Sequence, residues 1–257
     1  MRHAPQGPVV VLSPHLDDAL LSAWSVLSRP GEVRVVNVCS GVPRSGPPPR
    51  WDQLTGATDA AERMHERLAE DRVALRCAGR EATGLGFLDA HYRDDPIDPE
   101  ELLAGIGAAV PSARELWAPA GIGGHADHLQ AREAALTLGA QGGPPVHLYA
   151  DLPYAIKSGC PSWVPGEQPD ALDPGAWGPG VLPDGLPLAA DRHELSPDEV
   201  DRKLHALEQY RTQWSALDAS TGGKLSDPLV IRYEVSFAVQ PEEAASRGPS
   251  GGRASVS

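Results

Sequence analysis

The feature that most constrains the fold is a run of β-branched apolar residues near the start of the chain, PVVVLS at residues 8–13. An apolar run without alternating polar positions is the pattern of a strand that is buried on both faces, as in a parallel sheet. A second such run, VRVVNVC, follows at 33–39, and the apolar residues of the segment between them, 18–28, have helical spacing. Strand, helix and strand in this order predict a mostly parallel sheet with helices on both faces.

The same alternation continues along the chain. Further helices are predicted at 55–76, 100–110, 127–140 and 197–215, and further strands at 115–120, 146–150 and 228–239. In the helix at 55–76 the expected apolar stripe comprises Met64, Leu68, Val73 and Leu75. We therefore expect an α/β fold, a Rossmann-like sheet that forms a single domain over residues 1–240.

Pro and Gly interrupt this alternation in two places. Residues 41–50 hold four prolines and two glycines, which excludes a helix and predicts a stiff loop. Residues 158–192 hold thirteen Pro or Gly, yet they also carry Trp163 and Trp177. We expect a long, lid-like loop packed on the body, whose two indoles either stack on a ligand or anchor the loop in the core. Residues 241–257 have no apolar period and are predicted to be a disordered tail.

Composition and charge exclude several classes of function. Acidic residues outnumber basic ones by 35 to 22, a net charge of −13, which is the wrong sign for binding nucleic acid. No apolar stretch approaches the roughly 20 residues of a membrane span, and the N-terminal apolar run ends in charges rather than in a leader cleavage site. Cys39, Cys77 and Cys160 are too scattered for a disulfide framework or a cysteine-rich zinc site. We expect a cytoplasmic globular protein.

Two polar motifs follow predicted strands. SPHLDD, residues 13–18, links the first strand to a helix, and GGHADH, residues 123–128, follows the strand at 115–120. Ligands of such sheets bind beyond the carboxyl ends of the strands, so both motifs occupy the expected site. Taken singly, Asp17, Asp18 and Asp127 could instead cap helices and complement their dipoles.

Taken together, the motifs favour a metal site. Three of the nine histidines, His15, His125 and His128, fall in these two loops. His125 and His128 are three residues apart, which places them on one side of a helical turn. Two histidines with one carboxylate form a common zinc donor set that leaves a position open for water. Zinc in such a site lowers the pKa of water and polarises a carbonyl group.

The motifs also resemble those of a known family. PHLDDALLS, residues 14–22, resembles the PHPDDE signature of the LmbE-like, or PIG-L, N-acetylglucosaminyl deacetylases, and HADH resembles their second histidine motif. Three further segments are similar to the family: ERLAEDRVAL at 66–75, LGFLDAHYRDD at 85–95 and KLHALEQYRTQ at 203–213. The resemblance covers roughly residues 8 to 240.

The resemblance implies a function and a role for each motif residue. His15, Asp18 and His128 would bind one Zn²⁺ per chain, and Asp17 would be the general base toward a zinc-activated water. His125 would stabilise the oxyanion, and Asp127 would complete the catalytic set by orienting a histidine ring. The implied reaction removes the acetyl group from an N-acetylated amino sugar or glycoside.

Two positions depart from the family signature, and two others carry the implied substrate contacts. Leu16 replaces the usual proline and Ala19 the usual glutamate; neither is a metal ligand in the pattern. Arg67 and Asp94 fall where the family uses a basic and an acidic side chain to bind a sugar, although an ordinary surface ion pair would look the same.

Other functions remain open or are excluded. An amidase of a larger N-acyl or thiol conjugate and a non-catalytic metal-binding protein both agree with the motifs. The spare carboxylate of Asp17 and the spare ring of His125 favour catalysis. The first strand is not followed by the G-x-G-x-x-G of a dinucleotide site, and no G-x-S-x-G of a serine hydrolase occurs. The natural substrate, the physiological metal and any homo-oligomer are not determined by the sequence.

Overall fold

The computed structural model describes residues 7–166 and 171–241. Its centre is one sheet of seven strands in the order β3-β2-β1-β4-β5-β7-β6. The strands are β1 Val9–Ser13, β2 Val33–Asn37, β3 Ala82–Gly84, β4 Glu115–Pro119, β5 Val146–Tyr149, β6 Leu188–Glu194 and β7 Tyr233–Val239. Strands β1 to β5 are parallel to one another, whereas β7 is antiparallel to β5 and β6 is antiparallel to β7. The predicted α/β fold with a mostly parallel sheet is confirmed.

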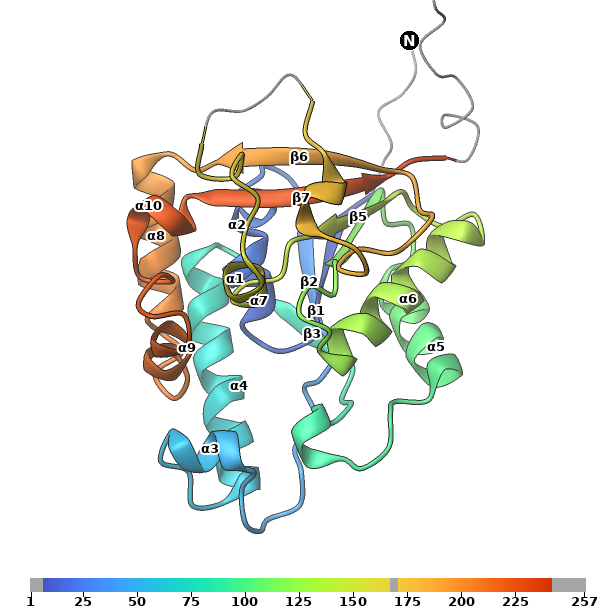
Figure 1. Cartoon of the computed structure of the whole chain (residues 1–257). Helices are drawn as coiled ribbons and strands as arrows, with labels where there is room; N and C mark the ends of the chain where they lie inside the picture. The colour runs from blue at the N-terminus through green and yellow to red at the C-terminus, as the bar shows by residue number, and fades with distance from the viewer. Residues whose placement is uncertain (1–6, 167–170, 242–257) are drawn as a thin grey trace, which may run out of the picture.

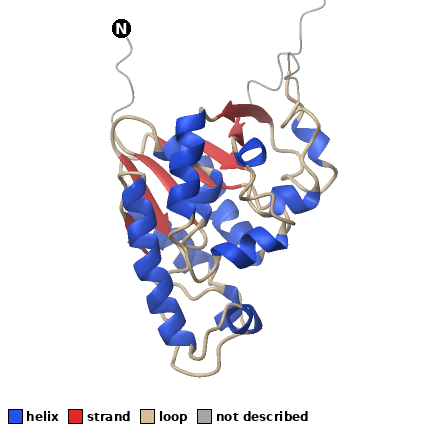
Figure 2. Ribbon diagram, turned by 90° about the vertical axis from the view of Figure 1, so that its left-hand side faces the viewer, coloured by secondary structure: helices blue, strands red, loops and turns tan. Residues whose placement is uncertain are grey.

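Helices cover both faces of the sheet (Figure 1). They are α1 Asp18–Ser22, α2 Trp24–Leu27, α3 Arg50–Leu54, α4 Ala60–Cys77, α5 Pro99–Ala109, α6 Ala126–Ala140, α7 Tyr154–Ser158, α8 Pro197–Leu207, α9 Trp214–Ser220 and α10 Pro228–Ile231. On one face α6 packs on β4 and β5, with α5 beside it; on the other, α1 packs on β1 and α8 contacts both α1 and α4. Figure 2 shows the long α4 at the side of the sheet.

The core explains why the first apolar run becomes the central strand. Val9, Val10, Val11 and Leu12 expose none of their surface. Helices cover the sheet on both faces, and the neighbouring strands β2 and β4 flank β1 at its two edges, so no side chain from Val9 to Leu12 reaches water. Burial on both faces is what the absence of polar alternation predicted.

The helix predicted at 18–28 is interrupted. It breaks at Ala23, where the backbone leaves the helical region (φ −136°, ψ 30°). The carboxylate of Glu234 accepts hydrogen bonds from the backbone N–H groups of Trp24 and Ser25, both at 2.8 Å, and so caps a new helix, α2. Because Glu234 lies in β7 near the other end of the chain, local spacing could not reveal the break.

Other predicted boundaries were wrong for local reasons. The helix predicted at 55–76 begins only at Ala60, because the side chain of Asp59 caps it by accepting from the N–H of Glu62. The segment predicted as one helix at 197–215 is two helices, α8 and α9, and the strand predicted from 228 begins as the short helix α10. Val73, expected in an apolar stripe, is 46% exposed.

Four elements were missed, namely α3, α7, β3 and β6. Helix α3 follows directly on the proline-rich loop and takes in its last predicted residue, Arg50. Strands β3 and β6 are the two edges of the sheet, and each pairs with a single neighbour. Side chains of β6 alternate between half-buried and exposed for most of its length, so the strand lacks the continuous apolar run that marks β1. Its first residues fall in the segment predicted as a loop, 158–192.

The two indoles of that segment anchor it to the body. Trp163 and Trp177 are 8% and 6% exposed, and their rings meet edge to face at 6.5 Å. Trp177 also packs edge to face on Phe237 of β7. The described part of the segment is thus attached through its aromatic side chains to the core; its role as a lid stays a prediction.

Two expectations concern the chain as a whole. Residues 242–257 of the predicted tail lie outside the described part of the chain. Among the helices that the structure describes, none has both the length and the apolar character that crossing a bilayer requires.

Candidate metal centre and its pocket

Both sequence motifs lie at the carboxyl edge of the sheet. β1 and β4 are direct neighbours, and each leads at its carboxyl end into a motif loop and then a helix. From β1 the chain crosses to β2 on one side, and later returns to β4 on the other. At such a switch point the loops diverge and leave a crevice, which is where α/β sheets bind their ligands.

Three donor atoms from the two loops form a nearly equilateral triangle. Nδ1 of His15 lies 3.3 Å from Nε2 of His128 and 3.4 Å from Oδ2 of Asp18. The third edge, from that Oδ2 to Nε2 of His128, measures 3.2 Å. Ligands of a tetrahedral zinc with bonds of about 2.0–2.1 Å are roughly 3.3–3.4 Å apart. The triangle therefore fits three ligands of such an ion, with a fourth position left free.

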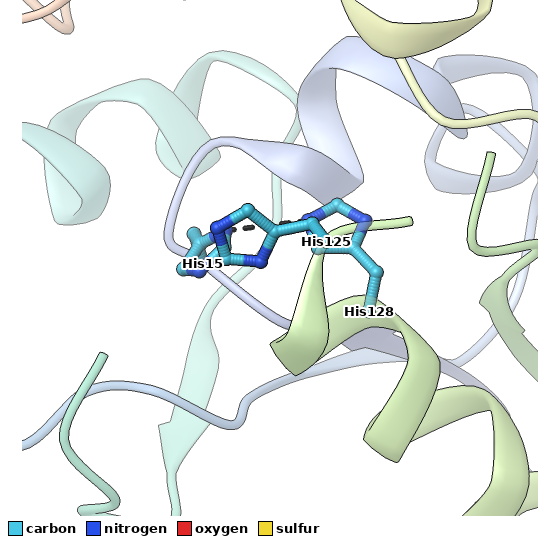
Figure 3. Close-up of side chains that lie close together, drawn as sticks. All are labelled: His15, His125 and His128. Carbon is cyan, nitrogen blue, oxygen red and sulfur yellow. Dashed lines mark hydrogen bonds between the residues drawn. The ribbon is translucent and has the colours of Figure 1, made fainter. Parts of the chain in front are cut away.

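The three motif histidines converge on this point (Figure 3). His15, His125 and His128 each offer a ring nitrogen within 4.8 Å of the others, so this triad could hold a metal ion. A second donor group, His15 with Cys39 and Asp127, also meets that distance. In that second group the carboxylate of Asp127 already accepts hydrogen bonds from Arg93 and from the backbone N–H of Ala90. The second group is therefore the poorer candidate for a metal site.

Carboxylates fix the far nitrogens of two of these histidines. Nε2 of His15 lies 3.0 Å from Oδ2 of Asp127, and Nδ1 of His128 lies 2.6 Å from Oδ1 of Asp151. Asp127 is itself held by the Arg93 guanidinium. A ring that donates its far N–H to a carboxylate presents its other nitrogen as a lone-pair donor, as metal-binding histidines do. His15 and His128 thus have the orientation that a metal ligand needs.

His125 is held differently. It caps the N-terminus of α6, and its Nδ1 accepts the backbone N–H of Asp127 at 3.3 Å. Burial, followed by the neighbouring rings of His15 and His128, lowers the pKa of His125 to about 4. The neutral ring must then carry its proton on Nε2, because Nδ1 is the acceptor. This nitrogen is a hydrogen-bond donor at neutral pH.

The two adjacent carboxylates have opposite electrostatic environments. Burial, and then the charge of Asp18, raises the pKa of Asp17 to about 6. Burial also opposes the charge of Asp18, but the rings of His128 and His15 outweigh it and hold the pKa of Asp18 well below its usual range. Pairs of carboxyl groups whose pKa values are pushed apart commonly divide acid–base work between them.

Short hydrogen bonds shape the loop that carries this pair. The Ser13 hydroxyl donates to the carbonyl of His15 at 2.6 Å and accepts the N–H of Ala19 at 2.9 Å. The N–H of His15 donates to Oδ2 of Asp18 at 2.7 Å. Asp17 is at the N-cap position of α1, yet its side chain makes no capping bond. Helix capping therefore does not account for either carboxylate.

A glycine shapes the second loop. Gly123 has φ of +86°, and a Cβ at this position would come within 2.7 Å of the Cβ of Tyr154. The tyrosine ring packs against both His125 and His128, at centroid distances of 5.9 and 5.4 Å. Only glycine permits this backbone to lie so close to the side chain that supports the histidines.

A cavity of about 270 Å³ opens beside the triangle. Its wall includes the motif residues His15, Asp17, Asp18 and His125. Apolar side chains form a further part of the wall, namely Leu16, Trp51, Met64 and Leu217. Lys157 of α7 adds a cation, and the phenol of Tyr154 lies beside it.

The two predicted substrate contacts lie in different places. Arg67 lines the cavity, but its guanidinium forms a buried ion pair with Asp52, which also accepts from the hydroxyl of Tyr92. Asp94 is exposed and is not part of the cavity wall as described. Asp89, by contrast, lines the cavity, with Oδ2 at 3.7 Å from Nε2 of His15. The substrate contacts of Arg67 and Asp94 stay predictions.

The sequence reasoning missed several residues of the site. Asp151, which orients His128, had a detectable signal, because it directly follows a predicted strand as the two motifs do. Two further residues of the cavity wall are His91, in the 3₁₀ helix Ala90–Tyr92, and Lys157, in α7. Nδ1 of His91 lies 2.9 Å from Asp89, and neither residue follows the end of a strand. Only the folded chain brings these two to the site.

Comparisons with known proteins agree with this geometry. No family model matches the sequence. The 2'-N-acetylparomamine deacetylase of Streptomyces fradiae is 32% identical over 166 residues, a match that spans only 58% of this chain and 58% of that protein. A triple mutant of a deacetylase of the teicoplanin biosynthetic pathway superposes with a TM-score of 0.71 at 28% identity, covering 91% of this chain and 98% of that one.

The zinc-inhibited form of teicoplanin deacetylase is similar as well, with a TM-score of 0.70 and 25% identity over 91% of this chain and 98% of that one. These structural matches extend over nearly the whole of both chains, far beyond the two motifs. With the two motifs brought together at the switch point of the sheet, these matches support the resemblance of this chain to the LmbE-like deacetylases.

Proposed function

We propose that the protein is a metal-dependent hydrolase that removes the N-acetyl group from an amino sugar or an amino-sugar conjugate. The observation that carries the proposal is the triangle of His15, Asp18 and His128, open on one side to a cavity into which Asp17 and His125 project. The named relatives, which act in paromamine and teicoplanin chemistry, support the substrate class.

The donor set suits zinc. His15 through Nδ1, His128 through Nε2 and Asp18 through its carboxylate would hold the ion. Bound zinc would supply a Lewis acid for the amide carbonyl and lower the pKa of water to about 7. Asp127 and Asp151 keep both rings in the tautomer that binding requires.

Asp17 would act as the general base and then as the general acid. Its carboxyl group lines the cavity next to Asp18. A group with a pKa of about 6 can accept a proton from the attacking water and return it to the departing amine near neutral pH. The amide C–N bond breaks as the amine takes this proton, and acetate is released.

His125 would stabilise the oxygen of the tetrahedral intermediate. The neutral ring carries its proton on Nε2, and the other nitrogen is fixed by the N–H of Asp127. A donor held in place before the reaction stabilises the developing negative charge without a cost of reorganisation.

A second candidate function is an amidase that acts on a larger acyl group. The apolar wall of the cavity, with Leu16, Trp51, Met64 and Leu217, favours an acyl chain longer than acetyl as one occupant. Both activities use the same metal centre, so the substrate panel decides between them.

The test incubates the zinc-loaded protein with N-acetylated amino sugars, their glycosides and matched longer N-acyl derivatives, followed by mass spectrometry. We expect loss of one acetyl group, and loss of nearly all turnover in Asp17→Asn with zinc content unchanged. An Asp17→Asn variant with a near-normal rate would contradict the role of the base. If the protein cleaves only the longer acyl groups, it is the amidase of the second candidate function. If it cleaves no member of the panel and yet binds zinc tightly, the site is a non-catalytic metal site.

A further inference from the structure

A buried carboxyl group lies beneath the loop that carries the metal site. Asp71 of α4 is 3% exposed and is not in the wall of the catalytic cavity. Its Oδ1 is 2.8 Å from the hydroxyl of Tyr210, and its Oδ2 is 2.7 Å from Nδ2 of Asn37 on β2. The same Tyr210 hydroxyl lies 2.9 Å from the carbonyl oxygen of Leu16, between His15 and Asp17.

These three contacts need three hydrogens. The Asn37 amide supplies one, to Oδ2 of Asp71. The Tyr210 hydroxyl has one hydrogen for two oxygen neighbours, Oδ1 of Asp71 and the carbonyl of Leu16. If Asp71 is ionised, one of those buried oxygen pairs contains no hydrogen. If Asp71 is protonated on Oδ1, it donates to Tyr210, and Tyr210 donates to Leu16.

We infer that Asp71 is a neutral carboxylic acid in the folded protein and that, through Tyr210, it positions the catalytic loop at the carbonyl of Leu16. Asp71 is thus a positioning residue, which touches neither metal nor substrate. Its effect on turnover rests on the proposed function, whereas its protonation state does not.

The charges around Asp71 agree with the neutral form. Burial raises the pKa of Asp71 to about 7; hydrogen bonds from Tyr210 and Asn37 oppose the rise, as does the exposed Arg72, and Asp17 adds to it. Asp71 and Asn37 border a second cavity of about 300 Å³, whose wall also includes the charged side chains of Arg72, Arg76, Arg80 and Glu81. Arg80 is engaged by backbone carbonyl groups. None of these cations is an ion-pair partner of Asp71 among the described residues.

The first test compares Asp71→Asn with the native chain in urea unfolding from pH 5 to pH 8.5. An amide keeps all three hydrogen bonds, since its NH₂ group donates to Tyr210 as the protonated acid does. The folded pKa of about 7 exceeds the unfolded value of 3.8, so the native carboxyl loses its contribution to stability as pH rises between them. The measured quantity is the folding equilibrium constant of Asp71→Asn divided by that of the native chain. This ratio should rise about tenfold per pH unit from pH 5 to about pH 7 and stay level above pH 7.

A matched control makes the same change at Asp52, a buried carboxylate paired with Arg67. Asp52→Asn should destabilise the protein at every pH tested, because it leaves a buried guanidinium without its partner. If Asp71→Asn behaves like Asp52→Asn, Asp71 is ionised and the inference is wrong. Infrared spectra at pH 6 give a direct check. The inference requires that the native chain shows the band of a protonated carboxyl group and that this band is absent from Asp71→Asn.

The second test addresses positioning. Tyr210→Phe removes the hydrogen bond to Leu16, and we expect kcat to fall roughly tenfold with KM and zinc content unchanged. Asp71→Asn should keep kcat within about twofold of native, because its hydrogen-bond pattern is the same. A Tyr210→Phe variant with native kcat would overturn the positioning role. If the chain has no deacetylase activity at all, the unfolding and infrared results still decide whether Asp71 is neutral.

Discussion

Asp151 provides the sharpest test of how the candidate metal centre is built. Its carboxylate accepts two hydrogen bonds, from Nδ1 of His128 at 2.6 Å and from the backbone N–H of Ile122 at 2.9 Å. Neither Asp151 nor His128 exposes any surface, so no water is at hand to replace a lost partner. The substitution Asp151→Asn keeps the shape and removes both the charge and one of the two acceptors.

The size of the effect follows from counting acceptors. An amide has one oxygen, so either His128 or Ile122 faces an NH₂ group that cannot accept. Removing the carboxylate behind a metal-binding histidine typically lowers metal affinity by about 10–100-fold, which is about 1.4–2.7 kcal/mol. A buried N–H left without a partner costs about 1–3 kcal/mol of folding stability. We expect both losses in Asp151→Asn.

The assay is zinc competition against a chromophoric chelator, with the native chain, Asp151→Asn and Asp17→Asn compared at one pH. Asp17 is not a ligand in the proposed site, so its variant should bind zinc within a few-fold of native and serves as the matched control. The fold of each variant is checked by circular dichroism. A folded Asp151→Asn that binds zinc as tightly as native would refute the argument that this carboxylate prepares His128.

Three further predictions follow from the same structure. Nζ of Lys203 is fully buried and lies 2.7 Å from Oε1 of Glu234, so Glu234→Ala leaves this ammonium group without its partner. Urea unfolding should show that the free energy of unfolding falls by about 3–5 kcal/mol, and a fall of less than about 1 kcal/mol would contradict the importance of the pair. Gly123→Ala should destabilise the protein and weaken zinc binding, whereas Gly124→Ala, whose Cβ meets nothing within 4 Å, should leave zinc binding unchanged. The carboxylates beside His128 outweigh burial and raise the pKa of this ring to about 9, and neighbouring carboxylates raise the pKa of His15 as well, so zinc must displace protons from its ligands. The apparent zinc affinity should therefore rise at least tenfold per pH unit below pH 9, and a pH-independent affinity would count against these rings as ligands.

The sequence predicted the elements with a strong local signal. The run at 8–13 became a buried central strand because uninterrupted β-branched residues can be accommodated only where both faces are covered. The motifs around His15 and His128 were expected to meet because both follow strands, and the carboxyl ends of parallel strands lie at one edge of the sheet. Edge strand β6 and the break at Ala23 escaped prediction, because both depend on partners in β7.

Local pattern thus determined the fold class, the edge of the sheet at which the two motifs lie and the residue types that meet there. Only the tertiary structure decided which ring nitrogen of each histidine faces a carboxylate, which carboxyl groups are buried and which side chains line the cavity beside the motifs. Those properties are set by contacts between residues far apart in the chain, such as His128 with Asp151, 23 residues on, and Asp71 with Tyr210, 139 residues on. Burial strengthens such contacts, and no local spacing encodes them.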